Sequence, residues 1–229
     1  MNSLQRMARP LTVLVEGNIG AGKTQFINRF NNIPHLQILQ EPVDKWRNVN
    51  GNNLLQLMYQ DPCRWSLAFQ TYVQLTMLEN HAVSLYPIKI MERSIYSARY
   101  CFVENLKRTG KMQSSEYEVL KAWFEYLISA PEMNIDADLI VYLRTTPKVA
   151  YERLKLRSRG EEHLIPLQYI KDLHGLHEDW LLNHSFPIPA PVVVIDADKD
   201  ACDLEEDFLN VKNMIIKPIY NQTLKTKCV

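Results

Sequence analysis

The sequence has no excess charge of either sign and no long apolar run. Its 229 residues carry 26 Lys and Arg against 26 Asp and Glu, so no overall field favours nucleic acid or a membrane surface. No apolar stretch approaches the ~20 residues that a membrane-spanning helix needs. We therefore expect no nucleic-acid partner and no membrane, and a small-molecule substrate fits this composition better.

Cysteine is also scarce, and its spacing indicates neither a disulfide framework nor a zinc site. Cys63, Cys101, Cys202 and Cys228 are scattered without a C-x-x-C pair, which suits a reducing compartment. Residues 1–10 lack the apolar core of a signal peptide, but two arginines without an acid leave a fragment of a mitochondrial transit sequence open. We expect a cytoplasmic protein, with a mitochondrial or nuclear location as the alternative.

Five short apolar runs predict buried strands, and segments of helical period lie between them. The predicted strands are residues 11–15, 36–39, 88–91, 138–143 and 192–195, and the predicted helices are residues 65–84, 98–107, 115–128, 147–159 and 166–182. This alternation predicts an α/β fold with a five-stranded parallel sheet flanked by helices. Residues 40–87 exceed an ordinary crossover, so we expect two helices and a loop there.

No Ser-, Gly- or Pro-rich linker divides the chain, and its 46% hydrophobic content supports one substantial core. We expect a flexible N-terminal segment at residues 1–10, one domain at residues 11–200, and a helical or disordered tail at residues 201–229. In a parallel sheet of this kind, ligands bind beyond the carboxyl ends of the strands. The residues that follow each strand are therefore the candidates for chemistry.

The first strand leads into a glycine-rich turn that reads Gly-Asn-Ile-Gly-Ala-Gly-Lys-Thr, a complete G-x-x-x-x-G-K-[ST] pattern. Such a turn points several backbone N–H groups at one spot, where phosphates bind against a helix N-terminus. The pattern predicts an ATP site in which Lys23 reaches the β- and γ-phosphates and the Thr24 hydroxyl faces Mg²⁺. Its residues are Gly17, Asn18, Ile19, Gly20, Ala21, Gly22, Lys23 and Thr24.

Carboxylates follow the second and third strands. Glu41 is placed to take a proton from a substrate hydroxyl, although a surface glutamate at the start of a loop remains an alternative. Glu92 can serve Mg²⁺, and Arg93 can neutralise charge beside the attacking hydroxyl. The alternative for this pair is an ion pair that caps the next helix.

A basic helix follows the fourth strand, and acidic residues follow the fifth. Arg153 and Arg157 are i, i+4 neighbours, so with Arg159 they can converge on the transferring phosphate as a lid that closes over ATP. A solvated basic face is the alternative. Asp196 and Asp198 either form a turn under the adenine base or are ordinary surface-turn residues.

These motifs resemble the deoxynucleoside kinase family, in particular its mitochondrial thymidine kinase and insect multisubstrate branches. The resemblance covers residues 11–198. Besides the glycine-rich turn, its motifs are Glu41-Pro-Val, Lys45-Trp-Arg-Asn, Leu57-Met-Tyr, Phe69-Gln-Thr-Tyr-Val, Met91-Glu-Arg-Ser, Ser97-Ala-Arg-Tyr, Phe102-Val-Glu-Asn and Leu176-His-Glu-Asp-Trp. It implies a P-loop NTPase fold of the nucleotide-kinase type with an arginine-bearing lid. The implied activity is ATP-dependent phosphorylation of the deoxynucleoside 5′-hydroxyl in nucleotide salvage.

The resemblance also implies roles at the reaction centre. Glu41 matches the general base for the sugar 5′-hydroxyl, Arg93 matches its partner, and Glu92 matches the carboxylate that serves Mg²⁺. Tyr59 and Glu162 match the pair that holds the 3′-hydroxyl. The lid arginines correspond to Arg153, Arg157 and Arg159. A homodimer through helices around residues 98–128 is a further implication of the resemblance, and feedback inhibition by a deoxynucleoside triphosphate is left open by the sequence.

The implied base pocket consists of Trp46, Gln70, Val73, Met77, Ala98 and Phe102. Gln70 matches an amide that hydrogen-bonds the base edge, and an amide both donates and accepts. Family members that prefer deoxycytidine or deoxyguanosine carry an Arg and an Asp where this chain has Met77 and Ala98. A neutral pocket accepts the thymine methyl because no buried charge pair has to be disrupted. Thymidine and deoxycytidine are favoured, and purine deoxynucleosides remain open.

Other functions explain the motifs less well. A regulatory GTPase needs an Asn-Lys-x-Asp motif, which the sequence lacks. A nucleoside monophosphate kinase shares the P-loop and lid, but Glu41 indicates a hydroxyl acceptor that needs a base. A nucleotide-binding module without catalysis does not need Lys23, Glu41 and Arg93 together.

Overall fold

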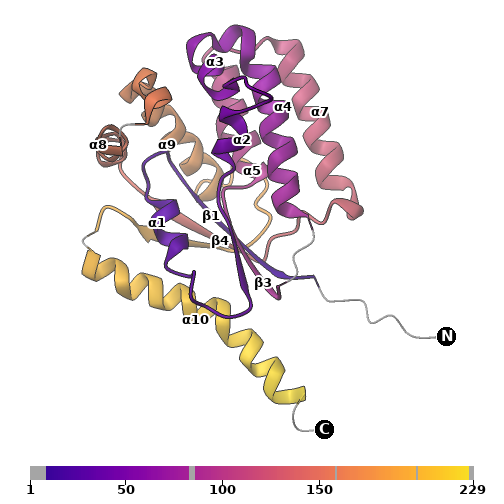
Figure 1. Cartoon of the computed structure of the whole chain (residues 1–229), viewed down its shortest axis with the longest axis vertical. Coiled ribbons are helices and arrows are strands. Elements are labelled where there is room, and N and C mark those ends of the chain that lie inside the picture. The colour runs from indigo at the N-terminus through magenta and orange to yellow at the C-terminus, as the bar shows by residue number, and fades with distance from the viewer. Residues whose placement is uncertain (1–8, 83–85, 158, 200, 227–229) are drawn as a thin grey trace, which may run out of the picture.

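The computed structural model describes residues 9–82, 86–157, 159–199 and 201–226 (Figure 1). Of the predicted flexible segment 1–10, only Arg9 and Pro10 belong to these residues. Five strands form one parallel sheet in the order β2-β3-β1-β4-β5. They are β1 (Leu11–Gly17), β2 (Leu36–Leu39), β3 (Ile88–Glu92), β4 (Leu139–Arg144) and β5 (Val192–Asp196). The predicted parallel α/β sheet is therefore confirmed, with strand ends that differ by at most two residues.

The helices fill the connections between these strands. They are α1 (Lys23–Asn28), α2 (Val43–Arg47), α3 (Leu54–Gln60), α4 (Pro62–His81), α5 (Ile95–Ser97), the π-helix η1 (Ala98–Val103), α6 (Glu104–Arg108), α7 (Ser114–Ser129), the 3₁₀-helix η2 (Pro131–Met133), α8 (Pro147–Arg157), the 3₁₀-helix η3 (Gly160–Leu164), α9 (Leu167–Leu181) and α10 (Ala201–Thr226). None of the described helices is long and apolar enough to cross a membrane.

Two predicted helical segments differ from the structure. The segment after β2 was expected to hold two helices and a loop, but it holds α2, α3 and α4. Asp61 separates the last two, because its side chain accepts a hydrogen bond from the Arg64 N–H and Pro62 starts α4 in the position that proline favours. The segment 98–107 begins as a π-helix and continues as α6. Wide π turns of this kind are frequent at functional sites.

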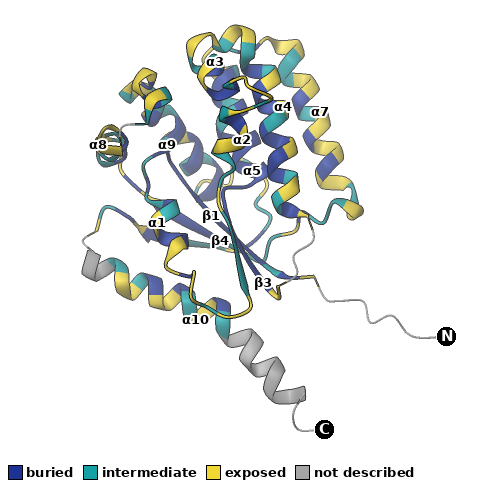
Figure 2. Ribbon diagram, in the orientation of Figure 1, coloured by how far each residue is buried: buried dark blue, intermediate teal, exposed yellow. Residues whose placement is uncertain are grey.

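The sheet is buried on both faces, as alternate residues of its central strand show. Leu14 points into a core that includes Trp180 of α9. Val13 and Val15 point into a second core with Phe30, near the end of α1. Each face therefore excludes water, which explains why the strands read as nearly continuous apolar runs (Figure 2).

The C-terminal segment is helical across α10, and it covers one face of the sheet. Phe208, Val211 and Ile215 are almost fully buried in the second core, where the Phe208 ring packs edge-on against Phe30 at 4.7 Å between centroids. Figure 1 shows α10 lying along the side of the sheet that also carries α1. Four residues of the segment that the sequence assigned to a tail thus contribute side chains to the core: Leu204, Phe208, Val211 and Ile215.

Candidate active site

A cavity lies beyond the carboxyl ends of β1, β2 and β3. Its walls come from the P-loop, α2, α3, α4, the β3–α5 turn, η1, the η3 segment and the start of α9. The predicted site residues that line it are Ile19, Lys23, Thr24, Glu41, Trp46, Tyr59, Gln70, Val73, Met77, Glu92, Arg93, Ala98, Phe102, Arg157, Arg159 and Glu162. The fold thus brings residues from every predicted group except the acidic turn after β5 to one cavity.

The P-loop is held in a shape that requires glycine. Gly20 has φ +82°, and a Cβ atom there would lie 2.2 Å from the Ala150 carbonyl oxygen of α8. The Asn18 amide nitrogen donates to the Ile170 carbonyl oxygen at 2.8 Å, which ties the loop to α9. These contacts fix a compact turn at the N-terminus of α1, where backbone N–H groups can bind an anion.

Lys23 is folded back onto this loop. Its ammonium group donates to the Asn18 carbonyl oxygen at 2.9 Å, and its side chain is only 5% exposed. Burial lowers the pKa of Lys23 to about 8, because the charged form loses solvation and Arg93 lies close by. A phosphate group in the P-loop would supply the negative charge that this buried cation lacks.

The two predicted magnesium ligands contact each other. The Thr24 hydroxyl donates to the Glu92 carboxylate, at 2.9 Å from Oε1 and 3.1 Å from Oε2. A hydroxyl and a carboxylate beside the P-loop are the hard oxygen donors that Mg²⁺ takes together with substrate phosphates. These residues therefore fit a magnesium ion held between protein and nucleotide.

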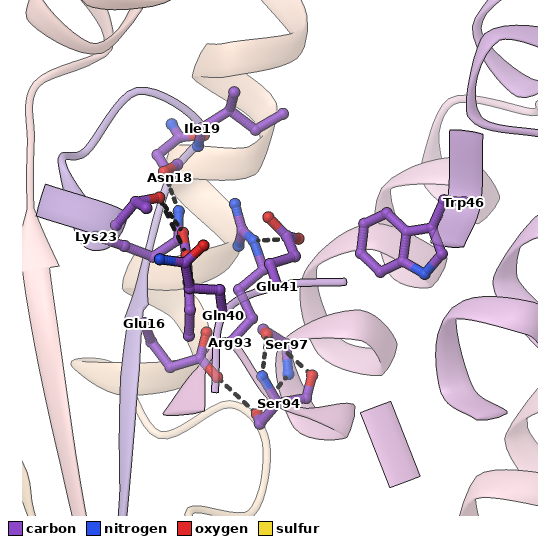
Figure 3. A network of polar contacts seen from close by, with 12 residues as sticks. Glu16, Asn18, Ile19, Lys23, Gln40, Glu41, Trp46, Arg93, Ser94 and Ser97 are labelled. Atoms are coloured by element: carbon purple, nitrogen blue, oxygen red, sulfur yellow. Dashed lines mark hydrogen bonds and ion pairs between the residues drawn. The ribbon is translucent and has the colours of Figure 1, made fainter. Parts of the chain in front are cut away.

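Glu41 and Arg93 form an ion pair in the cavity, with 2.9 Å between Oε1 and Nε (Figure 3). The pair lacks the geometry of a hydrogen bond, so Nε and Nη1 of Arg93 have no hydrogen-bond partner among the described residues. Arg93 is 3% exposed and its guanidinium carbon lies 4.7 Å from the Phe102 ring centroid. Unpaired N–H groups on a buried cation indicate a place for an oxygen-bearing substrate.

Arg93 also has a backbone conformation that is rare for a non-glycine residue, with φ at +63°. Its backbone N–H donates to the Val15 carbonyl oxygen at 3.0 Å, one residue past the end of β3. Strained residues of this kind cluster at functional sites, where the surrounding contacts maintain them.

The base-pocket residues form a mostly apolar wall with one polar group. Trp46 is 5% exposed, and its indole N–H donates to the Thr76 hydroxyl at 2.8 Å. Gln70 is 2% exposed, and its amide oxygen has no hydrogen-bond partner among the described residues. Met77 and Ala98 complete a neutral surface beside it. An unpaired buried acceptor in a pocket of this kind can receive an N–H group from a base.

The lid arginines separate into two groups. Arg157 donates to both carboxylate oxygens of Glu162, and Arg159 lies 3.7 Å from the same carboxylate. Arg153 is not among the residues that line the cavity. Arg153 lies four residues before Arg157 in α8, and its convergence with Arg157 on a phosphate stays a prediction.

The acidic residues at the end of β5, Asp196 and Asp198, hold a turn. The Asp198 carboxylate accepts hydrogen bonds from the Thr146 N–H, and Asp196 accepts one from the Asp198 N–H at 3.1 Å. Neither lines the cavity. Of the two interpretations of the sequence, turn formation accounts for these contacts, and a place under the adenine base stays a prediction.

Several residues of the site were missed from the sequence. Arg47 and Asn53 hold Glu161, which lines the cavity, and Tyr169 of α9 lines it as does Tyr59. Burial, followed by the nearby Tyr169 and Glu162, raises the pKa of Tyr59. The signal for Glu161 was its position beside Glu162 after a basic helix, and the signal for Arg47 was its place in the Lys45-Trp-Arg-Asn motif, but no signal joined the two.

The comparisons with known proteins agree with this site. A family model described as deoxynucleoside kinase matches residues 13–221. The chain is 50% identical over 208 residues to "Thymidine kinase 2, mitochondrial" of Macaca fascicularis, across 90% of this chain and 78% of that protein. It is 34% identical over 227 residues to deoxycytidine kinase of Homo sapiens, across 86% and 87% of the two chains. With its P-loop, its acidic strand ends and this similarity over most of its length, the chain belongs to the deoxynucleoside kinase family.

Proposed function

We propose that this protein transfers the γ-phosphoryl group of ATP to the 5′-hydroxyl of deoxynucleosides, with thymidine and deoxycytidine preferred. The observation that carries the proposal is the Glu41–Arg93 pair, which lies in the same cavity as Lys23 of the P-loop. A carboxylate and a buried guanidinium beside a phosphate site suit a hydroxyl acceptor. The names of the relatives, thymidine kinase 2 and deoxycytidine kinase, support the same substrates.

In this mechanism, Glu41 accepts the proton of the 5′-hydroxyl while that oxygen attacks the γ-phosphorus in line. Arg93 holds the Glu41 carboxylate and uses its unpaired N–H groups to bind the hydroxyl oxygen. Lys23, Arg157 and Arg159 stabilise the charge that spreads over the phosphoryl oxygens. Mg²⁺, held by Thr24 and Glu92 together with the nucleotide, neutralises phosphate charge when bound.

The base pocket favours pyrimidines for physical reasons. The Gln70 amide can donate to one edge atom of thymine or cytosine and accept from another, because it can rotate by half a turn. Val73, Met77 and Ala98 leave neutral space for the thymine methyl. On the sugar, Tyr59 and Glu162 lie at the cavity wall where they can hold the 3′-hydroxyl. Purine deoxynucleosides are bulkier substrates that the neutral wall does not exclude by charge.

The test is a set of initial rates with ATP and each of the four deoxynucleosides, with thymidine monophosphate as a fifth acceptor. We expect the highest kcat/KM with thymidine and deoxycytidine, and 5′-monophosphate as the product. A preference for the monophosphate acceptor would instead indicate a nucleoside monophosphate kinase. Omission of Mg²⁺ should abolish turnover in each case.

The continuous cavity also supports feedback inhibition by a deoxynucleoside triphosphate. Gln70 at the base end and Lys23 at the phosphate end line one cavity, so a single triphosphate can occupy both ends at once. Thymidine triphosphate should then compete with thymidine and with ATP in steady-state kinetics.

A homodimer through α4 and α7 is the assembly that the exposed surface supports. Leu75 of α4 and Val119, Trp123 and Tyr126 of α7 are 51%, 60%, 46% and 55% exposed, although all are large apolar or aromatic residues. Neighbouring exposed apolar side chains of this size mark interaction surfaces. Trp123→Glu should give a monomer in sedimentation analysis. Leu156→Glu, at an exposed leucine on α8, is the control that should leave the dimer intact.

Among the three compartments considered, the mitochondrion is the location we propose, because the name of the similar thymidine kinases includes that organelle. Fractionation of source cells, followed with an antibody against this chain, tests it. Recovery in the cytosolic fraction alone would contradict this location.

A further inference from the structure

Glu16 is a buried acid that the proposed mechanism does not use. It is the last residue before the P-loop glycine in β1, and its side chain is fully buried. It does not line the active-site cavity. A carboxyl group without access to water costs folding free energy, so its presence in the central strand needs an explanation.

The contact that Glu16 makes is with the turn that carries Arg93. The Ser94 hydroxyl donates to Glu16 Oε1 at 2.6 Å, and Oε2 has no hydrogen-bond partner among the described residues (Figure 3). The same hydroxyl oxygen accepts from the backbone N–H groups of Tyr96 and Ser97, which begin α5. Because two donors occupy the oxygen, its single proton is directed to Glu16.

Two adjacent residues of β1 therefore hold two adjacent residues of the turn. The Val15 carbonyl oxygen accepts from the Arg93 N–H, and the Glu16 carboxyl accepts from Ser94. Between these two bonds lies the left-handed backbone of Arg93, which a non-glycine residue adopts only when its surroundings maintain it. Loss of either bond would let the turn relax and move the guanidinium away from Glu41.

The charges around Glu16 agree with this arrangement. Burial raises the pKa of Glu16 to about 7, while the Ser94 hydrogen bond, the charge of Arg93, a weaker interaction with the Ser97 hydroxyl and the charge of Lys23 act in the opposite direction. The Cys101 thiol of η1 is a further titratable group close to it. Whether it is charged or neutral, the carboxyl group keeps an oxygen that can accept the hydrogen bond from the Ser94 hydroxyl.

We propose that Glu16 is a positioning residue, which through the Ser94 hydroxyl maintains the strained turn that places Arg93 against Glu41. The expected loss of turnover rests on the proposed kinase function. The structural role of Glu16 in the turn does not depend on that function. Its function is to fix the direction of the Arg93 side chain before the nucleoside binds. A misplacement of about 1 Å at a reaction centre can lower a rate by roughly 100-fold.

The kinetic test compares Glu16→Leu with Glu16→Gln. The leucine removes the acceptor, so kcat should fall by roughly 10- to 100-fold while the KM for ATP changes little. The glutamine keeps an oxygen that accepts a hydrogen bond from Ser94, so the Glu16→Gln variant should retain most of the kcat of the unmodified protein. Tyr142→Phe is the matched control: Tyr142 pairs with Glu16 in the sheet register and donates to Glu178 at 2.7 Å, away from Ser94. It should lower the melting temperature but leave kcat unchanged.

Ser94→Ala and the double variant with Glu16→Leu test the route through Ser94. If Glu16 acts through this hydroxyl, the double variant should lose no more activity than the more damaged single variant. Losses that multiply would overturn the route. If Glu16→Leu does not fold, Ser94→Ala alone decides the test. A kcat of Ser94→Ala close to that of the unmodified protein would contradict the proposal.

Amide hydrogen exchange supplies a readout that does not depend on kinase activity. Glu16→Leu or Ser94→Ala should accelerate exchange at Tyr96 and Ser97, whose N–H groups bond to the Ser94 hydroxyl. Unchanged exchange together with unchanged kcat would overturn the role of Glu16. An unmodified protein that phosphorylates no deoxynucleoside would instead overturn the proposed function, and the exchange result would still decide the role of Glu16.

Discussion

The Arg47 guanidinium and the Glu161 carboxylate form two parallel hydrogen bonds, each of 3.0 Å, that join α2 to η3. The Asn53 amide nitrogen donates to the same carboxylate at 3.0 Å. Although partial burial acts against it, the bonds from Arg47 and Asn53 lower the pKa of Glu161 to about 2. Glu161 therefore stays charged through neutral pH, and it fastens the predicted lid segment, which we define as Arg157 and residues 159–164, to α2 and the start of α3.

Glu161→Gln should loosen this lid segment. The amide cannot accept two charge-assisted bonds from Arg47, so Arg157 and Arg159 would be less well held over the phosphates. We expect the KM values for ATP and thymidine to rise several-fold in steady-state kinetics. Glu79→Gln, which breaks the exposed ion pair with Lys45 outside the cavity, is the control and should leave both values unchanged. Equal kinetics for the two variants would show that the Arg47–Glu161 pair does not control the lid.

Glu41→Gln tests the general base. The amide preserves the size of the side chain but cannot accept the hydroxyl proton, so kcat should fall by about 10²- to 10⁴-fold. Thymidine should still bind, because the base and sugar contacts of Gln70 and Tyr59 remain. Isothermal titration calorimetry measures the binding and a coupled assay measures the turnover. Turnover within a few-fold of the unmodified protein would exclude Glu41 as the base.

Met77→Arg combined with Ala98→Asp tests the neutral pocket. The two side chains would place a charged pair where the structure has an apolar wall, and this pair would have to be displaced by the thymine methyl. The ratio of kcat/KM for thymidine to that for deoxycytidine should fall at least tenfold, because a buried pair is costly to break. Each single variant serves as a control for general damage. An unchanged ratio would remove the pocket argument for thymidine preference.

The lowered pKa of Lys23 predicts the pH above which kcat/KM for ATP falls. Because burial lowers its pKa to about 8, the free enzyme carries the charged lysine below that pH and the neutral amine above it. The kcat/KM for ATP, which reports the free enzyme, should therefore fall as pH rises above about 8. The bound phosphates raise the pKa again, so kcat at saturating ATP should fall only at higher pH. Parallel decline of both parameters would contradict this assignment.

The fold was largely predictable because its signals are local. A strand, a glycine-rich turn and the start of a helix are decided by residues near one another in the chain, as in residues 11–28. The helix boundaries that the sequence did not predict also have physical reasons. Nothing in the sequence shows where a helix ends when the following turn is stabilised by distant groups, so α8 was extended to Arg159 although it ends at Arg157. The third helix after β2 was missed because its boundary depends on a single capping aspartate, Asp61.

The sequence by itself determined the sheet, the P-loop and the kind of residue at each strand end, because short apolar runs and a glycine-rich turn are each formed by neighbouring positions. Only the tertiary structure decided which of these residues meet. Glu161 and Arg47 are 114 positions apart, and Glu16 and Ser94 are 78 positions apart. Such pairs form because parallel strands bring their carboxyl ends to one edge and the helices between them close over it. Pairing across that edge depends on packing, which no local pattern encodes.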